Sequence, residues 1–309
     1  EVCSSDLMTK TKKILLAFMC FIIIGGVLYK INDVRQKNEK SVQAIITNNQ
    51  NIKLKKIVNE KLLAKAKAKK VEQAKEAQKV KSAKEAKALL EINKKKEALK
   101  KNLAKVVVID PGHASITSKV LEREAPDSIK TKIKEPGGAQ GINTRTPEYV
   151  VNMAVAVRLK ALLVKKGYNV KMTKTQNSQM LGNIARAEVG NNAKANLVIR
   201  IHADSNDDSS VNGASMLVPT DTKNTDPIYK LSKQYGQVVF RSLIKDVGMN
   251  DRGVVERDDM TGFNWSKVPV ILVEMGFLSN RSEDQMLSTG AYQDKLAKGL
   301  ADGIEAALK

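Results

Sequence analysis

The only two histidines of the chain each follow an apolar run that is typical of a buried β-strand. V-V-V-I-D-P-G precedes His113, and L-V-I-R-I precedes His202. A third apolar run, V-I-L-V, ends at Glu274. Because ligands bind at the carboxyl ends of the strands in open α/β sheets, we expect these three side chains at one edge. Two imidazoles and a carboxylate there are the donors that a catalytic zinc site needs.

Glu148 is a second candidate for the carboxylate ligand. It falls in the first turn of a helix predicted over residues 147–166, which Thr146 can cap and Pro147 can start. The apolar stripe that predicts one buried face of this helix consists of Val151, Val155, Leu159 and Leu162. Taken alone, a glutamate in a first turn is structural, because the helix dipole favours it there. Beside two histidines, it becomes the leading candidate for a third metal ligand.

The elements that position these residues alternate in type from Lys105 onward. Strands are predicted over residues 105–109, 168–173, 197–201, 214–218 and 269–273. Helices are predicted over residues 147–166, 183–194, 227–246 and 291–308. This alternation predicts an α/β fold with an open, mostly parallel sheet and helices on both faces. A segment of roughly 200 residues is long enough for one substantial core, in which we expect Trp265.

Most of the net charge of +20 lies in one lysine-rich segment. Residues 51–105 contain 19 basic and 6 acidic side chains, with no proline or glycine. Because lysine, alanine, glutamate and leucine favour helices, residues 32–104 are predicted to form a helical stalk. Apolar residues recur at every third position from 71 to 92, a period that argues against a coiled-coil seam. A solvated spacer is one interpretation and attraction to a polyanion is the other; the lack of aromatic residues disfavours nucleic acid.

An uncharged apolar run from Ile14 to Tyr29 lies between lysines. It is slightly shorter than the roughly 20 residues that cross a bilayer as a helix, but the flanking lysines can extend the span. Basic residues before the run predict an inside N-terminus and an outside C-terminus. A cleaved signal peptide is the alternative, although no A-x-A pattern follows the run. Residues 1–31 are therefore predicted to be an uncleaved, single-pass anchor in the cell membrane, with Met8 as a candidate start.

Four motifs occur in order along the predicted α/β part: V-V-V-I-D-P-G-H-A (106–114), R-T-P-E-Y-V-V-N (145–152), A-R-A-E-V-G-N-N-A-K-A-N-L-V-I-R-I-H-A-D (185–204) and V-P-V-I-L-V-E-M-G-F-L-S-N (268–280). Together they resemble the zinc-dependent N-acetylmuramoyl-L-alanine amidases of bacteria. The resemblance covers residues 105–309 and does not extend to the anchor or the stalk. Two positions depart from the family pattern: Ala114, where glycine is common, and Asp204, where asparagine is frequent.

The resemblance implies that His113, Glu148 and His202 hold Zn²⁺ and that Glu274 is the catalytic carboxylate. The implied substrate is peptidoglycan, cut at the amide between N-acetylmuramic acid and L-alanine. Zinc would activate a water, and Glu274 would move its proton to the leaving amine. The alternatives are a non-catalytic wall-binding protein on this fold and a zinc peptidase that cuts within the stem peptide. The catalytic domain would face the wall from outside the membrane, with anionic wall polymers or lipid head groups as partners of the stalk.

Two residues near the expected site each have two possible roles, and one nearby segment is predicted to be a loop. Asp110 either accepts a hydrogen bond from His113 or stabilises the D-P-G turn. Arg186 either binds at the site or pairs with Glu188 or another carboxylate. Residues 115–143 are polar and charged and contain two prolines and adjacent glycines, so we expect a loop beside the cleft.

Overall fold

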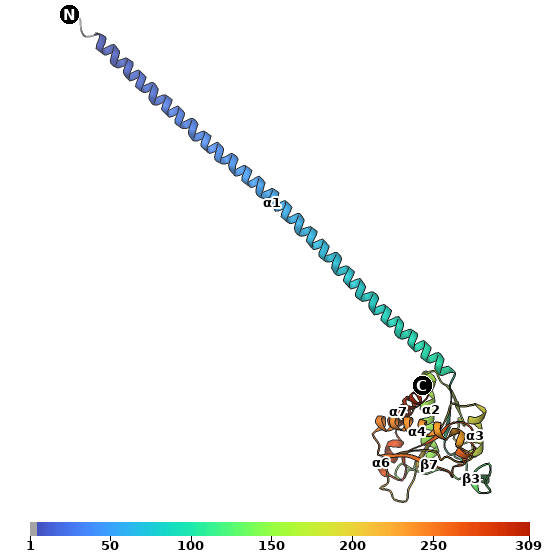
Figure 1. Cartoon of the computed structure of the whole chain (residues 1–309). Coiled ribbons are helices and arrows are strands. Elements are labelled where there is room, and N and C mark those ends of the chain that lie inside the picture. Colours follow the sequence, from blue (N-terminus) through green and yellow to red (C-terminus); the bar gives the residue numbers. More distant parts are fainter. Residues whose placement is uncertain (1–4) are drawn as a thin grey trace. The chain divides into compact units, whose positions relative to one another are not determined.

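The computed structural model describes residues 5–309 of the chain, with side chains from Lys12 onward (Figure 1). Cys3 therefore lies outside the described residues. The chain consists of two compact units, and the boundary between them lies between Leu89 and Leu90. The finer division into residues 1–31, 32–104 and 105–309 stays a prediction.

Helix α1 (Ser5–Leu103) contains both the apolar run and the lysine-rich segment. It is long and apolar enough to cross a membrane by length and composition. The apolar side chains near its start are solvent-exposed, and Phe21 is 82% exposed. An exposed apolar surface of this size is typical of a membrane or partner contact.

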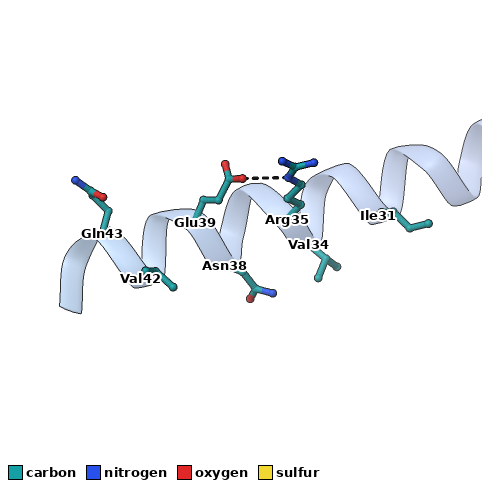
Figure 2. A pocket seen from close by; sticks show the side chains of 7 residues that line it. All are labelled: Ile31, Val34, Arg35, Asn38, Glu39, Val42 and Gln43. Atoms are coloured by element: carbon teal, nitrogen blue, oxygen red, sulfur yellow. Dashed lines mark hydrogen bonds and ion pairs between the residues drawn. The ribbon is translucent and has the colours of Figure 1, made fainter. Parts of the chain in front are cut away.

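Farther along α1, polar side chains pair along the helix surface. Figure 2 shows Arg35 and Glu39 on one side of the helix, with Nε of Arg35 3.1 Å from Oε1 of Glu39. Lys37 and Asp33 form a similar pair, with 2.8 Å between Nζ and Oδ2. Exposed pairs four residues apart stabilise a helix by only about 0.2–0.5 kcal/mol each. The helix therefore rests mainly on the helix-forming composition of its residues.

The second unit is built on a six-stranded sheet whose order is β4-β1-β5-β8-β6-β7. Its strands are β1 (Val106–Pro111), β4 (Asn169–Met172), β5 (Leu197–Asp204), β6 (Ala214–Pro219), β7 (Asp251–Arg257) and β8 (Val270–Phe277). Strands β4, β1, β5 and β8 are parallel, whereas β6 pairs antiparallel with β8 and parallel with β7. The prediction of a mostly parallel α/β sheet is therefore confirmed.

Helices cover both faces of the sheet. Helices α2 (Glu148–Lys165), α4 (Asp226–Val247) and α7 (Gly290–Ala307) pack on one face, and α3 (Asn183–Asn192) and α5 (Thr261–Asn264) pack on the other. Val107 and Ile109 of β1 enter the first core, and Val108 enters the second, because successive side chains of a strand point to opposite faces. Burial on both faces explains why these strands are continuous apolar runs in the sequence.

The expectation of a loop over residues 115–143 is wrong for residues 118–123 and 131–135, which form strands. This segment forms an antiparallel hairpin of β2 (Ser118–Arg123) and β3 (Thr131–Glu135). Its exposed strands lack a clear apolar alternation, and a register shift interrupts the pairing between Ser118 and Leu121, so the period-two signal is weak. Strand β7 and helix α6 (Arg281–Leu287) also have no counterpart among the predicted elements.

Trp265 does not lie in the core, contrary to expectation. Its side chain is half-buried, and its Nε1–H donates a hydrogen bond to the carbonyl oxygen of Arg123, 3.2 Å away in the hairpin. The indole N–H needs an acceptor when it leaves water, and the backbone of β2 supplies one. Trp265 therefore helps to attach the hairpin to the domain.

Candidate metal centre

The strand register places His202 beside Glu274. These residues are partners in the parallel pairing of β5 with β8, and both lie within their strands and not beyond the strand ends. On the other side of β5, Gly112 follows β1, and its backbone N–H donates to the carbonyl oxygen of Ile201 at 2.9 Å. This bond brings His113 to the same edge of the sheet. The neighbouring strands β1, β5 and β8 thus bring together residues that are up to 161 positions apart in the sequence.

Helix α2 supplies Glu148 from its first turn. The helix begins at Glu148 with Pro147 as its N-cap, so the expected cap at Thr146 is one residue too early. The carboxylate is only 3% exposed. It accepts hydrogen bonds from the backbone N–H groups of Ala203 (3.1 Å) and Ala139 (2.9 Å). These bonds fix the side chain at the edge of the sheet in addition to any effect of the helix dipole.

His113, Glu148 and His202 form a cluster that could hold a metal ion, with one potential ligand atom from each residue within 4.8 Å of the others. Oε2 of Glu148 lies 3.4 Å from Nε2 of His113, and Oε1 lies 3.1 Å from Nδ1 of His202. Nε2 of His202 is buried and has no hydrogen-bond partner, which a metal would provide. Two imidazoles and one carboxylate are a donor set typical of catalytic divalent metals.

The backbone around the cluster is adapted to this close approach. His113 has a φ of 58°, in the left-handed region that non-glycine residues rarely adopt. A Cβ on Gly112 would lie 2.2 Å from Cε1 of His202, and a Cβ on Gly138 would lie 2.6 Å from Oε2 of Glu148. Glycine is therefore required at both positions for the backbone to pass so close to the clustered side chains.

The protonation states of the cluster suit metal binding. Burial opposes ionisation of Glu148, but the hydrogen bond from His202 and the nearby histidines outweigh it and lower the pKa of Glu148 to about 2. Burial lowers the pKa of His202 to about 4, against the effect of Glu148. At neutral pH the carboxylate is charged and the His202 ring is neutral, which are the forms that bind a metal.

Glu274 is in a different environment from Glu148. Its side chain is half-buried, and its Oε2 has no hydrogen-bond partner. Burial, followed by the negative charges of Glu148 and Asp204, raises the pKa of Glu274 well above its usual value. A carboxyl group with a raised pKa can both accept and donate a proton near neutral pH.

Asp110 does not contact His113, so the first interpretation of this residue is wrong. Its carboxylate is buried and accepts hydrogen bonds from Arg186 (2.7 Å), Arg200 (2.9 Å) and Thr173 (2.6 Å). The carboxylate pairs with both guanidinium groups, so it balances buried positive charge. Arg186 pairs with Asp110 and with Glu135, and not with Glu188.

The carboxylate that does contact His113 belongs to Glu135, which the sequence interpretation did not single out. Its Oε1 lies 2.9 Å from Nδ1 of His113. Burial opposes its ionisation, but the hydrogen bond from His113 and the charge of Arg186 lower the pKa of Glu135. The only local signal was a glutamate followed by Pro-Gly-Gly shortly before Glu148, and that pattern does not indicate which imidazole it reaches.

Comparisons with known proteins identify relatives of the α/β part. The family model of the N-acetylmuramoyl-L-alanine amidases matches residues 107–306. N-acetylmuramoyl-L-alanine amidase LytC of Bacillus subtilis is 28% identical over 207 residues, which are 66% of this chain and 40% of LytC. Probable cell wall amidase LytH of Staphylococcus saprophyticus is 23% identical over 202 residues, which are 65% of this chain and 58% of LytH.

A solved structure with the same fold is the catalytic domain of CwlV, an N-acetylmuramoyl-L-alanine amidase from Bacillus (Paenibacillus) polymyxa var. colistinus. It is 28% identical, with a TM-score of 0.53, and the match covers 65% of this chain and 96% of that domain. The match to LytC and LytH spans less than two thirds of the length of either protein. The residues matched by the family model include His113, Glu148, His202 and Glu274, whereas α1 precedes them.

Proposed function

Because the chain belongs to the N-acetylmuramoyl-L-alanine amidase family, we propose that it hydrolyses peptidoglycan between N-acetylmuramic acid and L-alanine of the stem peptide. The observation that supports this proposal most is the cluster of His113, Glu148 and His202 at the sheet edge, with Glu274 on the neighbouring strand. The cluster supplies potential ligands for one metal ion, and Glu274 on the adjacent strand can accept and donate a proton.

The ion proposed for this cluster is Zn²⁺, held by His113, Glu148 and His202. Two neutral imidazoles and one carboxylate fit this ion, and they leave part of its coordination sphere for other groups. When bound, zinc lowers the pKa of water towards about 7 and polarises carbonyl oxygens. Gly112 and Gly138 keep space for the ligands because neither carries a side chain.

Glu274 is the proposed general base and acid of the reaction. Its carboxylate takes a proton from the water that attacks the amide carbon. It then delivers this proton to the nitrogen of L-alanine, so that the C–N bond breaks with release of a neutral amine. The half-buried position of Glu274 and its raised pKa favour retention of the proton between these two transfers.

The amino-terminal part is proposed to locate the enzyme. The apolar start of α1 would anchor the chain in the cell membrane as a single span, with the α/β domain outside. The exposed lysines of residues 51–105 would attract anionic wall polymers or lipid head groups, an attraction that salt weakens.

The proposal is tested by incubating the full chain with purified peptidoglycan and identifying the products by mass spectrometry. We expect free stem peptides with L-alanine at their N-terminus, loss of these products with a chelator, and their return with zinc. Cleavage only within the stem peptide would identify a peptidase instead. Binding of peptidoglycan by the zinc-loaded chain without any cleavage would identify a non-catalytic wall protein.

A further inference from the structure

One imidazole of the metal-ligand cluster lies between two carboxylates. Nε2 of His113 is 3.4 Å from Oε2 of Glu148, whereas Nδ1 is 2.9 Å from Oε1 of Glu135. Glu135 is the last residue of β3 and is 3% exposed. Because an ionised carboxylate only accepts hydrogen bonds, Nδ1 of His113 must carry the proton. Nε2 is then left with a free lone pair on the side of the cluster.

Glu135 is itself held in place through both of its oxygen atoms. Oε1 also accepts a hydrogen bond from the backbone N–H of Gly137 at 3.3 Å. Oε2 lies 3.2 Å from Nη2 of Arg186, and Nη1 of the same guanidinium lies 2.7 Å from Oδ1 of Asp110. Arg186 is almost completely buried, so solvent screens these charges little. The carboxylate cannot rotate away from His113 without breaking a buried ion pair.

The hairpin that carries Glu135 is attached to the domain at several other points. Glu122 of β2 accepts a hydrogen bond from the backbone N–H of Asn183 at 2.7 Å, at the start of α3. Nζ of Lys132 in β3 lies 3.2 Å from Oδ2 of Asp259. With the hydrogen bond from Trp265 to the hairpin backbone, these contacts attach the hairpin to the domain at points other than Glu135.

We propose that Glu135 is a positioning residue of the metal centre, which selects the His113 tautomer and aims Nε2 at the metal. This inference rests on the proposed function, which places Zn²⁺ among His113, Glu148 and His202. A carboxylate on the outer nitrogen of a metal-bound histidine fixes the ring and increases its basicity, and loss of such a partner typically weakens metal binding by about 10- to 100-fold. The hairpin is therefore part of the metal centre and not only a cover beside it.

The test measures zinc affinity of the full chain by competition with a chromophoric chelator, together with the absorption spectrum of the Co²⁺-loaded chain. Glu135→Gln and Glu135→Ala are compared with Glu122→Gln, which alters another buried glutamate of the same hairpin. We expect zinc affinity to fall by about 10- to 100-fold in the Glu135 variants, most in Glu135→Ala, with a changed Co²⁺ spectrum. We expect Glu122→Gln to keep the affinity and spectrum of the wild type while it loses some stability.

Three results would contradict the inference. Wild-type zinc affinity in a folded Glu135 variant would show that the contact is not used. An equal loss in Glu122→Gln would mean that hairpin stability, and not this carboxylate, controls binding. If Glu135→Ala does not fold, Glu135→Gln decides, because it preserves the size of the side chain. A wild-type chain that binds no zinc would instead overturn the proposed metal centre and the inference together.

Discussion

At the scale of single residues, the environment of each carboxylate decides what it can do. Glu148 is surrounded by histidines and backbone N–H groups, and its pKa is lowered to about 2. Glu274 is half-buried, has an unpaired oxygen and has a raised pKa. Two carboxyl groups whose pKa values are moved apart are suited to different tasks. Here the ionised Glu148 is suited to binding a cation, and Glu274 is suited to accepting and donating a proton.

Glu274→Gln tests the proton-transfer role. The amide preserves the size of the side chain but cannot take up a proton, so we expect kcat to fall by about 10²–10⁴-fold. Zinc content is expected to stay unchanged, because Glu274 is not one of the three clustered residues. Release of stem peptides by mass spectrometry and the zinc content of the purified chain check this. Glu256→Gln, at an exposed site on β7, is the control, and wild-type turnover by Glu274→Gln would exclude the role.

The environment of Asp110 predicts that the free energy of unfolding depends on pH in the acid range. Although burial opposes its ionisation, Arg186 and Arg200 lower the pKa of Asp110 well below its usual value of about 3.9. Its stabilising effect is therefore complete above about pH 4 and is lost as the pH falls further, because the unfolded chain then binds more protons. At pH 7, Asp110→Asn is expected to lower the free energy of unfolding by about 3–5 kcal/mol, since it removes the carboxylate paired with buried Arg200 and one of the two carboxylates paired with Arg186.

Denaturant unfolding at pH 7 and at about pH 3 checks this prediction. The difference between the wild type and Asp110→Asn should be large at neutral pH and smaller in acid. Asp207→Asn, at an exposed position, is the control and should have little effect at either pH. An equal difference at both pH values would mean that the charge of Asp110 does not stabilise the fold.

At the scale of elements, the cluster of His113, Glu148 and His202 depends on the contact of α2 with the sheet. Helix α2, whose first residue is Glu148, packs on β1 and β5. Strand β1 precedes His113, and strand β5 contains His202. The buried face of the helix includes Val151, Val155 and Leu159, as the apolar stripe predicted. Packing of this face sets the height of Glu148 relative to the two strands.

Leu159→Ala should therefore cost much more stability than a change on the outer face of α2. Leu159 is completely buried, so its truncation leaves a cavity, and we expect a loss of about 2–5 kcal/mol in the free energy of unfolding. Val157→Ala is the matched control, because Val157 is 52% exposed and should change stability by about 0.5 kcal/mol or less. Denaturant unfolding compares the two variants, and similar losses would argue against the described face of α2.

At the scale of the whole molecule, charge and chemistry lie in different segments. Nearly all residues of the lysine-rich segment belong to α1, whereas the candidate metal centre is formed by His113, Glu148 and His202, which follow α1 in the chain. The matched family region starts at residue 107, after α1 has ended. This arrangement predicts that the first part of α1 determines the location of the chain in the cell and does not affect the proposed hydrolysis.

Deletion of residues 1–50 tests this separation. The uncharged apolar run from Ile14 to Tyr29 is then absent, so we expect a soluble chain that hydrolyses peptidoglycan at a rate similar to the full chain in detergent. Fractionation of cells that express each chain, with the full chain as the membrane-bound control, checks the first part, and product release checks the second. Insolubility, or inactivity of a folded shortened chain, would contradict the modular interpretation.

Features that depend on local pattern could be predicted from the amino-acid sequence alone. Buried strands are apolar runs and α2 has an apolar stripe, so the α/β class and the sheet edge of His113 and His202 could be predicted. The partners of the buried charges, in contrast, became known only from the folded structure. Glu135, on a hairpin with little apolar alternation, reaches His113 across 22 positions. Asp110 of β1 pairs with Arg200 of the neighbouring strand β5 across 90 positions. Ion pairs between distant segments leave no periodic signal, because they depend on which surfaces the fold brings together.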